Sequence, residues 1–205
     1  MNQAGMSATG KHFPGHGDTA TDSHLGLPVI DKTKAELLEN ELYPFQQLIK
    51  NGVNSIMVGH LSVPALTADS SLPSSINKDI ITGILRNEMG FDGVVISDAL
   101  NMHAVSKNYP TPGQLEWLAF NAGNDVLCFA EHIEEGIEMM TRLILSRKNL
   151  EEVIRQTDMD LQADTPAAME GLATKLAGSI ILKGGDQDRK KSKDTMYELS
   201  YQGTS

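Results

Sequence analysis

Four short apolar runs typical of β-strands alternate with helical patterns, and this alternation constrains the fold more than any other feature of the sequence. The runs occupy residues 6–12, 53–59, 93–98 and 125–129. Between the first two, apolar residues recur at intervals of four, three and four, namely at Leu38, Leu42, Phe45 and Ile49. Strands that alternate with helices form parallel βαβ units, so the sequence predicts an α/β fold with a parallel sheet.

Further helices are predicted from periodic stretches and from the glycines that end them. One predicted helix contains Ile80 and Ile84 and ends at Gly90. Four more are predicted at residues 113–122, 133–144, 150–161 and 167–177. A short apolar run follows at residues 179–182. Residues 183–205 are mostly polar and cannot bury enough apolar surface to offset their ordering entropy, so they are predicted to form a disordered polar tail.

The composition excludes several functional classes. The chain carries 17 Lys and Arg against 27 Asp and Glu, a net charge of −10, which argues against nucleic-acid binding and against docking to anionic lipid. No apolar run approaches the ~18 residues of a membrane span, so no membrane insertion is expected. Residues 1–10 show no signal peptide, and the compartment stays open between cytoplasm and periplasm. The single Cys128 excludes an internal disulfide framework.

The segment after the first apolar run, residues 11–24, concentrates side chains that can do chemistry. Three interpretations of it stay open from spacing alone. Asp22 and His24 could form an acid/base pair in which the carboxylate fixes the imidazole tautomer. The polar side chains could instead cap backbone groups of a glycine-rich loop. Alternatively, the histidines and aspartates could bind a divalent metal ion through His12, His16, Asp18, Asp22 and His24.

A second candidate is Asp98, which directly follows the apolar residues 94–96. A buried strand would present this carboxylate at its carboxyl end, where α/β folds place ligand sites. The alternative interpretation is that Asp98 is the N-cap of a following short helix. We interpret the other polar residues near predicted strand ends, His16, His60 and Asp125, as structural.

Three motifs together resemble glycoside hydrolase family 3. They are Lys11-His12-Phe13-Pro14-Gly15-His16-Gly17-Asp18, Asp22-Ser23-His24 and Ile96-Ser97-Asp98-Ala99-Leu100-Asn101-Met102. The similarity covers residues 3–182 and is greatest to the bacterial β-N-acetylhexosaminidases that act in peptidoglycan turnover. The resemblance implies that Asp98 is the nucleophile of a retaining mechanism and that His24, paired with Asp22, is the acid/base. It also implies that Lys11 and His12 bind the sugar, that Met102 lines the pocket, and that no metal or organic cofactor takes part.

The resemblance further implies a TIM barrel, which takes ~250 residues for eight strand–helix units. This chain has room for four, so we expect the C-terminal half of the barrel, units five to eight, at residues 1–165. The start of a linker or second domain is expected at residues 166–182, ahead of the polar tail at 183–205. A half barrel leaves open strand edges, so a missing N-terminal half or self-association is expected as the partner.

The implied activity is the release of terminal β-linked N-acetylglucosamine from a glycan or muropeptide, with low activity for this chain alone. Two alternatives remain. One is a glycoside phosphorylase of the same family, because a histidine acid/base leaves the site less anionic toward phosphate. The other is a non-catalytic half-barrel remnant that binds sugar or a partner chain.

Overall fold

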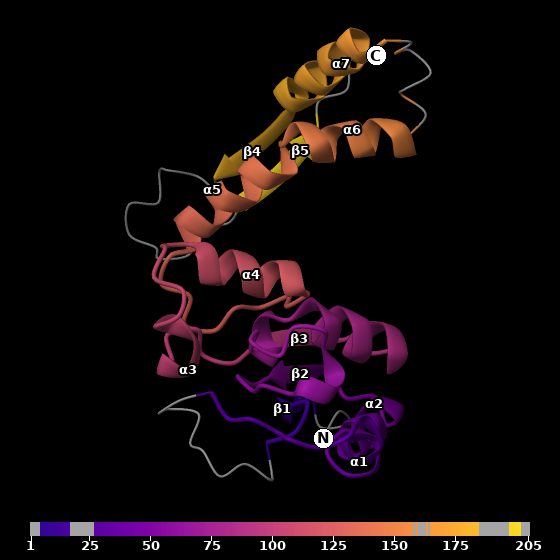
Figure 1. Ribbon diagram of the computed structural model, residues 1–205, viewed down its shortest axis with the longest axis vertical. Helices are drawn as coiled ribbons and strands as arrows, with labels where there is room; N and C mark the ends of the chain where they lie inside the picture. Colours follow the sequence, from indigo (N-terminus) through magenta and orange to yellow (C-terminus); the bar gives the residue numbers. More distant parts are fainter. Residues whose placement is uncertain are drawn as a thin grey trace. The chain divides into compact units, whose positions relative to one another are not determined.

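The computed structural model describes residues 5–16, 27–157, 159, 163, 165–184 and 197–201. The chain divides into two compact units, Met1–Ile137 and Glu138–Ser205 (Figure 1). The division falls ahead of the boundary expected at residue 165, because the helices after Arg147 pack on each other and are grouped with the end of the chain.

The first unit is built on a three-stranded parallel sheet with the order β1-β2-β3. Its strands are β1 (Thr9–Phe13), β2 (Ser55–Val58) and β3 (Val94–Ser97), and the prediction of a parallel α/β fold is confirmed.

The fourth predicted strand, at residues 125–129, is reduced to one parallel bridge between Ile96 and Val126. The reason is local. The side chain of Asp125, in place of a backbone carbonyl, accepts the hydrogen bond from the Val95 amide, and Phe129 adopts a left-handed backbone with φ of 49°. Both features interrupt a regular ladder.

Two short helices, α1 (Lys34–Glu39) and α2 (Tyr43–Lys50), stand where the periodic spacing predicts one. A capping box on Thr33 begins α1, and Pro44 lies in the first turn of α2. Proline is accepted there but would break a helix interior, which explains the division. As a result Leu38 is 40% exposed, whereas Leu37 is buried.

The elements between β2 and β3 are the 3₁₀ turns η2 (Pro64–Leu66) and η3 (Ser74–Ile76) and the π-helix η4 (Asp79–Glu88). Gly90, with a φ of +67°, follows the end of η4 as the sequence predicts.

Three helices follow β3. These are α3 (His103–Ser106), α4 (Gln114–Ala122) and α5 (Ile133–Ile144). The predicted end of α4 at Gly123 is confirmed, since this residue caps the helix with a left-handed φ of 114°.

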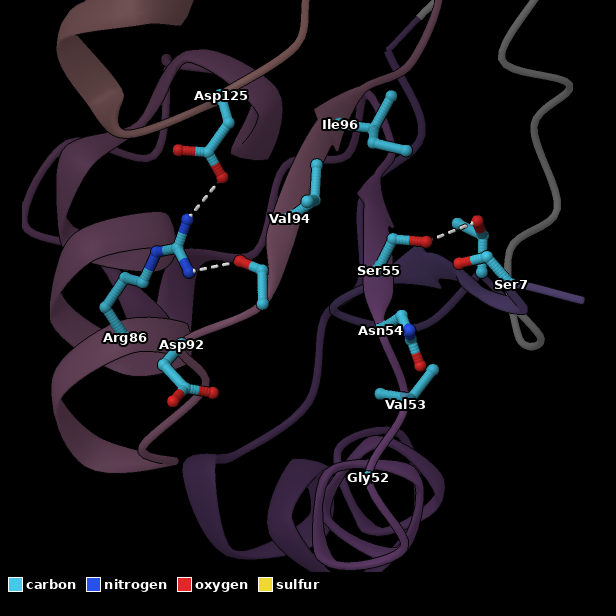
Figure 2. Close-up of a pocket in the computed structure, with 12 residues that line it drawn as sticks. Ser7, Gly52, Val53, Asn54, Ser55, Arg86, Asp92, Val94, Ile96 and Asp125 are labelled. Carbon is cyan, nitrogen blue, oxygen red and sulfur yellow. Dashed lines mark hydrogen bonds and ion pairs between the residues drawn. The ribbon is translucent and has the colours of Figure 1, made fainter. Parts of the chain in front are cut away.

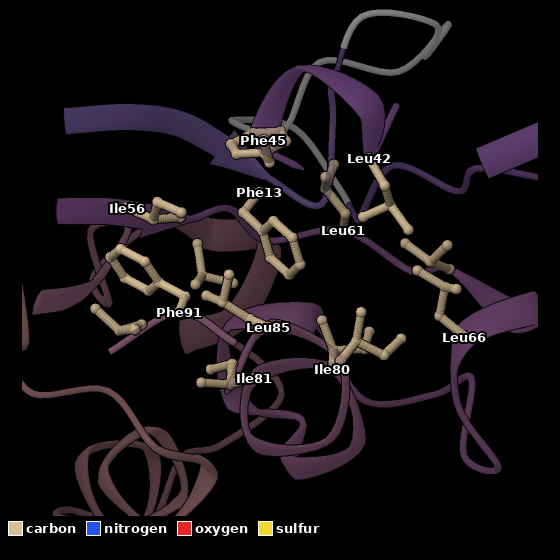
Figure 3. Close-up of a cluster of buried hydrophobic side chains, with 14 of the residues drawn as sticks. Phe13, Leu42, Phe45, Ile56, Leu61, Leu66, Ile80, Ile81, Leu85 and Phe91 are labelled. Atoms are coloured by element: carbon tan, nitrogen blue, oxygen red, sulfur yellow. The ribbon is translucent and has the colours of Figure 1, made fainter. Parts of the chain in front are cut away.

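The core of the first unit lies on one face of the sheet (Figure 3). Phe13 and Ile56 project from β1 and β2 into a cluster of buried residues that also contains Leu42, Phe45, Ile80, Ile81 and Leu85. Val95 of β3 belongs to the same cluster. The residues that alternate with them are more accessible, and Val94 is 43% exposed. Parallel strands usually have both faces covered, so this sheet is unusual in that respect.

The second unit contains α6 (Arg147–Gln156) and α7 (Pro166–Ser179), which pack through Leu150, Ile154, Ala173 and Leu176. Helix α6 begins earlier than predicted because Ser146 takes the N-cap position, and it ends at Gln156 instead of residue 161. In the described part of the chain, no helix combines the length and apolar character needed to cross a membrane.

A hairpin of antiparallel strands, β4 (Ile180–Gly184) and β5 (Tyr197–Tyr201), ends the described chain. The prediction of a disordered tail from residue 183 is therefore wrong at residues 183–184 and 197–201. The prediction rested on the overall polarity of this segment and did not consider its local pattern. The sequence of β5 alternates apolar and polar residues, as a strand does.

Candidate active site

The carboxyl ends of β1 and β3 bring two predicted site residues together. The Nε2 atom of His12 lies 3.8 Å from Oδ2 of Asp98, and the two side chains are 29% and 20% exposed. Strand β2 separates β1 from β3, so the two residues meet across the end of the middle strand. The arrangement gives a carboxylate and an imidazole that face solvent together at one edge of the sheet.

The two oxygens of Asp98 have different surroundings. Oδ1 accepts a hydrogen bond of 2.8 Å from the Ala99 amide, while Oδ2 is the oxygen nearest His12. The Asp98 amide donates to the Val58 carbonyl and so extends the pairing of β3 with β2. Met102, and not Asp98, occupies the N-cap position of α3, so the interpretation of Asp98 as that helix's N-cap is wrong.

Burial lowers the pKa of His12 below its usual value, and the neighbouring charges of Lys11 and His16 act in the same direction. The carboxylate of Asp98 opposes this shift but does not outweigh it. The imidazole is therefore neutral near pH 7, with one nitrogen able to donate and one able to accept. Its ring meets that of His16 edge to face, with 6.1 Å between the centroids.

The other predicted sugar-binding residues lie close in the chain to this pair. Lys11 is exposed on β1, and together with His12, His16 and Glu41 it lines a cavity of about 550 Å³. Met102 is partly buried, and its amide donates to the Ala99 carbonyl, within the turn that follows Asp98.

The predicted acid/base pair, Asp22 and His24, lies outside the described residues. The same is true of Asp18 in the alternative metal site. Among the residues that the structure describes, no group of three or more His, Cys, Asp or Glu side chains is arranged to hold a metal ion.

Two further residues, His60 and Cys128, lie near Asp98, and the sequence pattern led us to interpret His60 as structural. His60 is 1% exposed and hydrogen bonds through both ring nitrogens, to Ser75 and to the Ala99 carbonyl. Its position directly after the second apolar run is the signal that could have associated it with the site. Cys128 is partly buried, and burial together with the charge of Asp98 raises the pKa of its thiol, which stays protonated near neutral pH.

A larger cavity, of about 1230 Å³, lies at the amino ends of the same strands (Figure 2). There Arg86 donates to the Asp125 carboxylate at 2.6 Å and to the Gly93 carbonyl at 2.6 Å. Asp125 also accepts from the Val95 amide at 2.7 Å. The interpretation of Asp125 as structural is therefore confirmed, and this end of the sheet is braced by hydrogen bonds to the backbone.

Comparison with known proteins agrees with the motifs. Residues 1–163 match the Glycosyl hydrolase family 3 N terminal domain. A β-hexosaminidase of Haemophilus influenzae is 38% identical over 159 residues, which are 76% of this chain and 44% of that protein. A β-hexosaminidase of Chromobacterium violaceum is 37% identical over 143 residues, 70% of this chain and 39% of its own length.

Solved structures give the same relationship. A glycoside hydrolase family 3 β-N-acetylglucosaminidase from Paenibacillus superposes with a TM-score of 0.59 and 32% identity, covering 90% of this chain and 39% of the other. The β-N-acetylglucosaminidase from Thermotoga maritima gives a TM-score of 0.57 and 29% identity, with 86% and 39% covered. The chain spans less than half the length of these relatives. With its matching domain and its relatives in agreement, the chain belongs to glycoside hydrolase family 3.

Proposed function

We propose that this chain provides the catalytic groups for retaining hydrolysis of terminal β-linked N-acetylglucosamine. The observation that carries the proposal is Asp98, whose Oδ1 accepts a hydrogen bond from a backbone amide while Oδ2 lies beside His12 in a side chain that is 20% exposed. A retaining glycosidase needs an ionised carboxylate oxygen free to reach the anomeric carbon. The relatives named β-hexosaminidase support an amino sugar, and the similar structures of β-N-acetylglucosaminidases support N-acetylglucosamine.

In the first step of the proposed reaction, Oδ2 of Asp98 attacks the anomeric carbon and the bond to the leaving oxygen breaks. His24 donates a proton to that oxygen, and the sugar remains bound to Asp98 as a covalent intermediate. In the second step His24 takes a proton from water, which displaces the sugar and frees Asp98. Asp22 would orient the His24 ring throughout.

Lys11, His12 and Met102 would bind the sugar beside Asp98. Because the pKa of His12 is lowered, its neutral ring can hydrogen bond a sugar hydroxyl without forming a full ion pair with the nucleophile. The negative charge on Asp98 then remains available for the attack on the anomeric carbon.

The sheet would form half of a closed barrel. The successive parallel order of β1, β2 and β3, continued by the bridge at Val126, is that of neighbouring barrel strands. The exposed Val94 on the less covered face also supports additional strands opposite it. These strands would come from the complementary half, whether that half belongs to a longer chain or to a separate one, or from a second copy. Without them we expect slow turnover.

The test is the hydrolysis of an aryl β-N-acetylglucosaminide by the wild-type chain, by Asp98→Ala and by Asp92→Ala. The proposal predicts slow release by wild type, a loss of at least about 10³-fold in Asp98→Ala, and no change in Asp92→Ala, since Asp92 is exposed. Equal rates for wild type and Asp98→Ala would contradict it. Products are analysed with and without phosphate, and formation of a sugar 1-phosphate would show that the reaction is phosphorolysis and not hydrolysis.

Size-exclusion chromatography with light scattering tests the half-barrel arrangement in the same sample. Self-association, or exposed apolar surface that binds a hydrophobic dye, is expected for the chain alone. A monomer without such surface and with a turnover typical of complete glycosidases would contradict the arrangement.

A further inference from the structure

His60 lies at the carboxyl end of β2, between the strands that carry His12 and Asp98. Its side chain is almost fully buried, with 1% exposure. Nε2 is 2.8 Å from the Ala99 carbonyl oxygen, and Nδ1 is 2.6 Å from the Ser75 hydroxyl. A buried polar ring with both nitrogens bonded has one fixed orientation.

The partners of His60 determine its tautomer. A carbonyl oxygen can only accept, so Nε2 must carry the proton that it shares with Ala99. In a neutral ring Nδ1 is then an acceptor, and the Ser75 hydroxyl donates to it. Burial lowers the pKa of His60, which keeps the ring neutral near pH 7 despite the opposing effects of Ala99 and Asp98.

The hydrogen bond to Ala99 acts on the residue that holds the proposed nucleophile. The Ala99 amide donates to Oδ1 of Asp98, and the Ala99 carbonyl accepts from His60 and from the Met102 amide. Ala99 is therefore fixed at both of its peptide groups. A fixed Ala99 amide determines which carboxylate oxygen it binds and leaves Oδ2 free.

The other end of the His60 ring is anchored in the interior. Ser75 lies in η3 and is fully buried, and its carbonyl accepts a hydrogen bond of 2.8 Å from the Asn124 side chain. Ser74 holds the backbone on both sides of His60, since its hydroxyl donates to the Gly59 carbonyl and accepts from the Leu61 amide. These bonds give His60 a rigid support from which to hold Ala99.

We propose that His60 is a positioning residue that sets the geometry of the Asp98 carboxylate through the Ala99 carbonyl. The inference rests on the proposed role of Asp98 as nucleophile. His60 itself does not contact the sugar. Its role is to keep the Ala99 amide on Oδ1, so that Oδ2 is the oxygen that attacks.

Two substitutions of His60 test the hydrogen bonds of its two ring nitrogens separately. In His60→Gln the amide nitrogen can take the place of Nε2 and still donate to Ala99, whereas in His60→Asn the shorter amide reaches only toward Ser75. Hydrogen exchange of the Ala99 amide is measured by NMR on the full chain. The Val95 amide, which lies in β3 and donates to the Asp125 carboxylate, is the internal reference.

The proposal predicts that His60→Asn raises the exchange rate of the Ala99 amide by about 10-fold, toward the rate in Asp98→Ala, while Val95 changes little. His60→Gln should restore the slow rate. Transfer to Asp98 from a slow fluorinated N-acetylglucosaminyl donor should fall by about 10-fold to 100-fold in His60→Asn and recover in His60→Gln. An Ala99 amide that stays equally protected in His60→Asn would overturn the proposal.

If His60→Asn is unfolded, so that Val95 also exchanges fast, the protonation of the His60 ring nitrogens in the wild-type chain tests the proposal instead. Long-range ¹⁵N–¹H spectra should show the proton on Nε2 and a bare Nδ1, and a proton on Nδ1 would overturn the proposal. The exchange results do not require turnover. A missing sugar adduct in the wild type, with the His60 signature intact, would therefore refute the proposed function and leave the positioning of the carboxylate established.

Discussion

Replacing Asp125 by alanine removes two interactions that brace the amino end of β3. One is the hydrogen bond of 2.7 Å from the Val95 amide, and the other is the ion pair with Arg86 at 2.6 Å. Val95 is fully buried in the core, so its amide depends on the Asp125 carboxylate as its partner. The two interactions contribute differently to the free energy of unfolding because they differ in their exposure to water.

The amide bond should account for most of the loss of stability. An unpaired buried donor costs about 1–3 kcal/mol, and a hydrogen bond to a charged acceptor lies in the upper part of that range. The Asp125 side chain is 49% exposed, so solvent reduces the ion pair to at most about 1 kcal/mol. We therefore expect Asp125→Ala to lower the free energy of unfolding by about 2–3 kcal/mol. Asp125→Asn keeps an acceptor oxygen and should cost about 1 kcal/mol.

Urea unfolding followed by the fluorescence of Trp117 measures this loss. Trp117 is the only tryptophan and lies on α4 in the same compact unit, so it reports on the unit that contains Asp125. The matched control is Asp92→Ala, an exposed carboxylate beside the same cavity, which should change stability by less than about 0.5 kcal/mol. A loss in Asp125→Ala no larger than in Asp92→Ala would refute the reasoning. Equal losses in Asp125→Ala and Asp125→Asn would show that the ion pair dominates.

Four further predictions concern other parts of the first unit. Gly83→Ala should stabilise the unit by about 0.5–1 kcal/mol, because a Cβ in η4 would have no atom nearer than 3.9 Å. Gly93→Ala should cost about 1–3 kcal/mol, since its Cβ would lie 2.5 Å from the Asn54 carbonyl oxygen; urea midpoints check both. Because the pKa of His60 is lowered in the folded chain, the unfolded chain binds more protons below about pH 6.5. The free energy of unfolding should therefore rise with pH through that window, and rise less steeply in His60→Gln. Urea midpoints at several pH values check this. His24→Ala should slow poor leaving groups far more than activated aryl glycosides, and equal losses in kcat/KM on both would make His24 a binding residue.

The parallel sheet and the edge that holds Asp98 could be predicted because they follow from local chain properties. Alternating strand and helix patterns leave few topologies, and the carboxyl ends of parallel strands meet at one edge. The structure places His12 and Asp98 at that edge, with 3.8 Å between Nε2 of His12 and Oδ2 of Asp98. The spacing of apolar residues, in contrast, predicted one helix through Tyr43 and Pro44, because periodicity does not register the missing amide of proline.

Other features depend on contacts that a sequence does not display. The fourth strand shortens because the Asp125 side chain competes for a backbone amide, and the partner of that amide is fixed only by the fold. His60 was interpreted as structural, and its bonds to Ser75 and Ala99 join segments 15 and 39 residues away. Its position after the second apolar run places it near the site, but the bonds that connect it to Ala99 and Ser75 are visible only in the structure.

In the proposed reaction, Asp98 forms a covalent bond to the sugar. Incubation with a slow fluorinated N-acetylglucosaminyl donor, followed by intact mass measurement and peptide mapping, tests it most directly, because the adduct accumulates even in a slow site. We expect one sugar on Asp98 in the wild-type chain and none in Asp98→Ala. A sugar attached to any other residue, or a wild-type chain that hydrolyses the aryl glycoside but never becomes labelled, would contradict it.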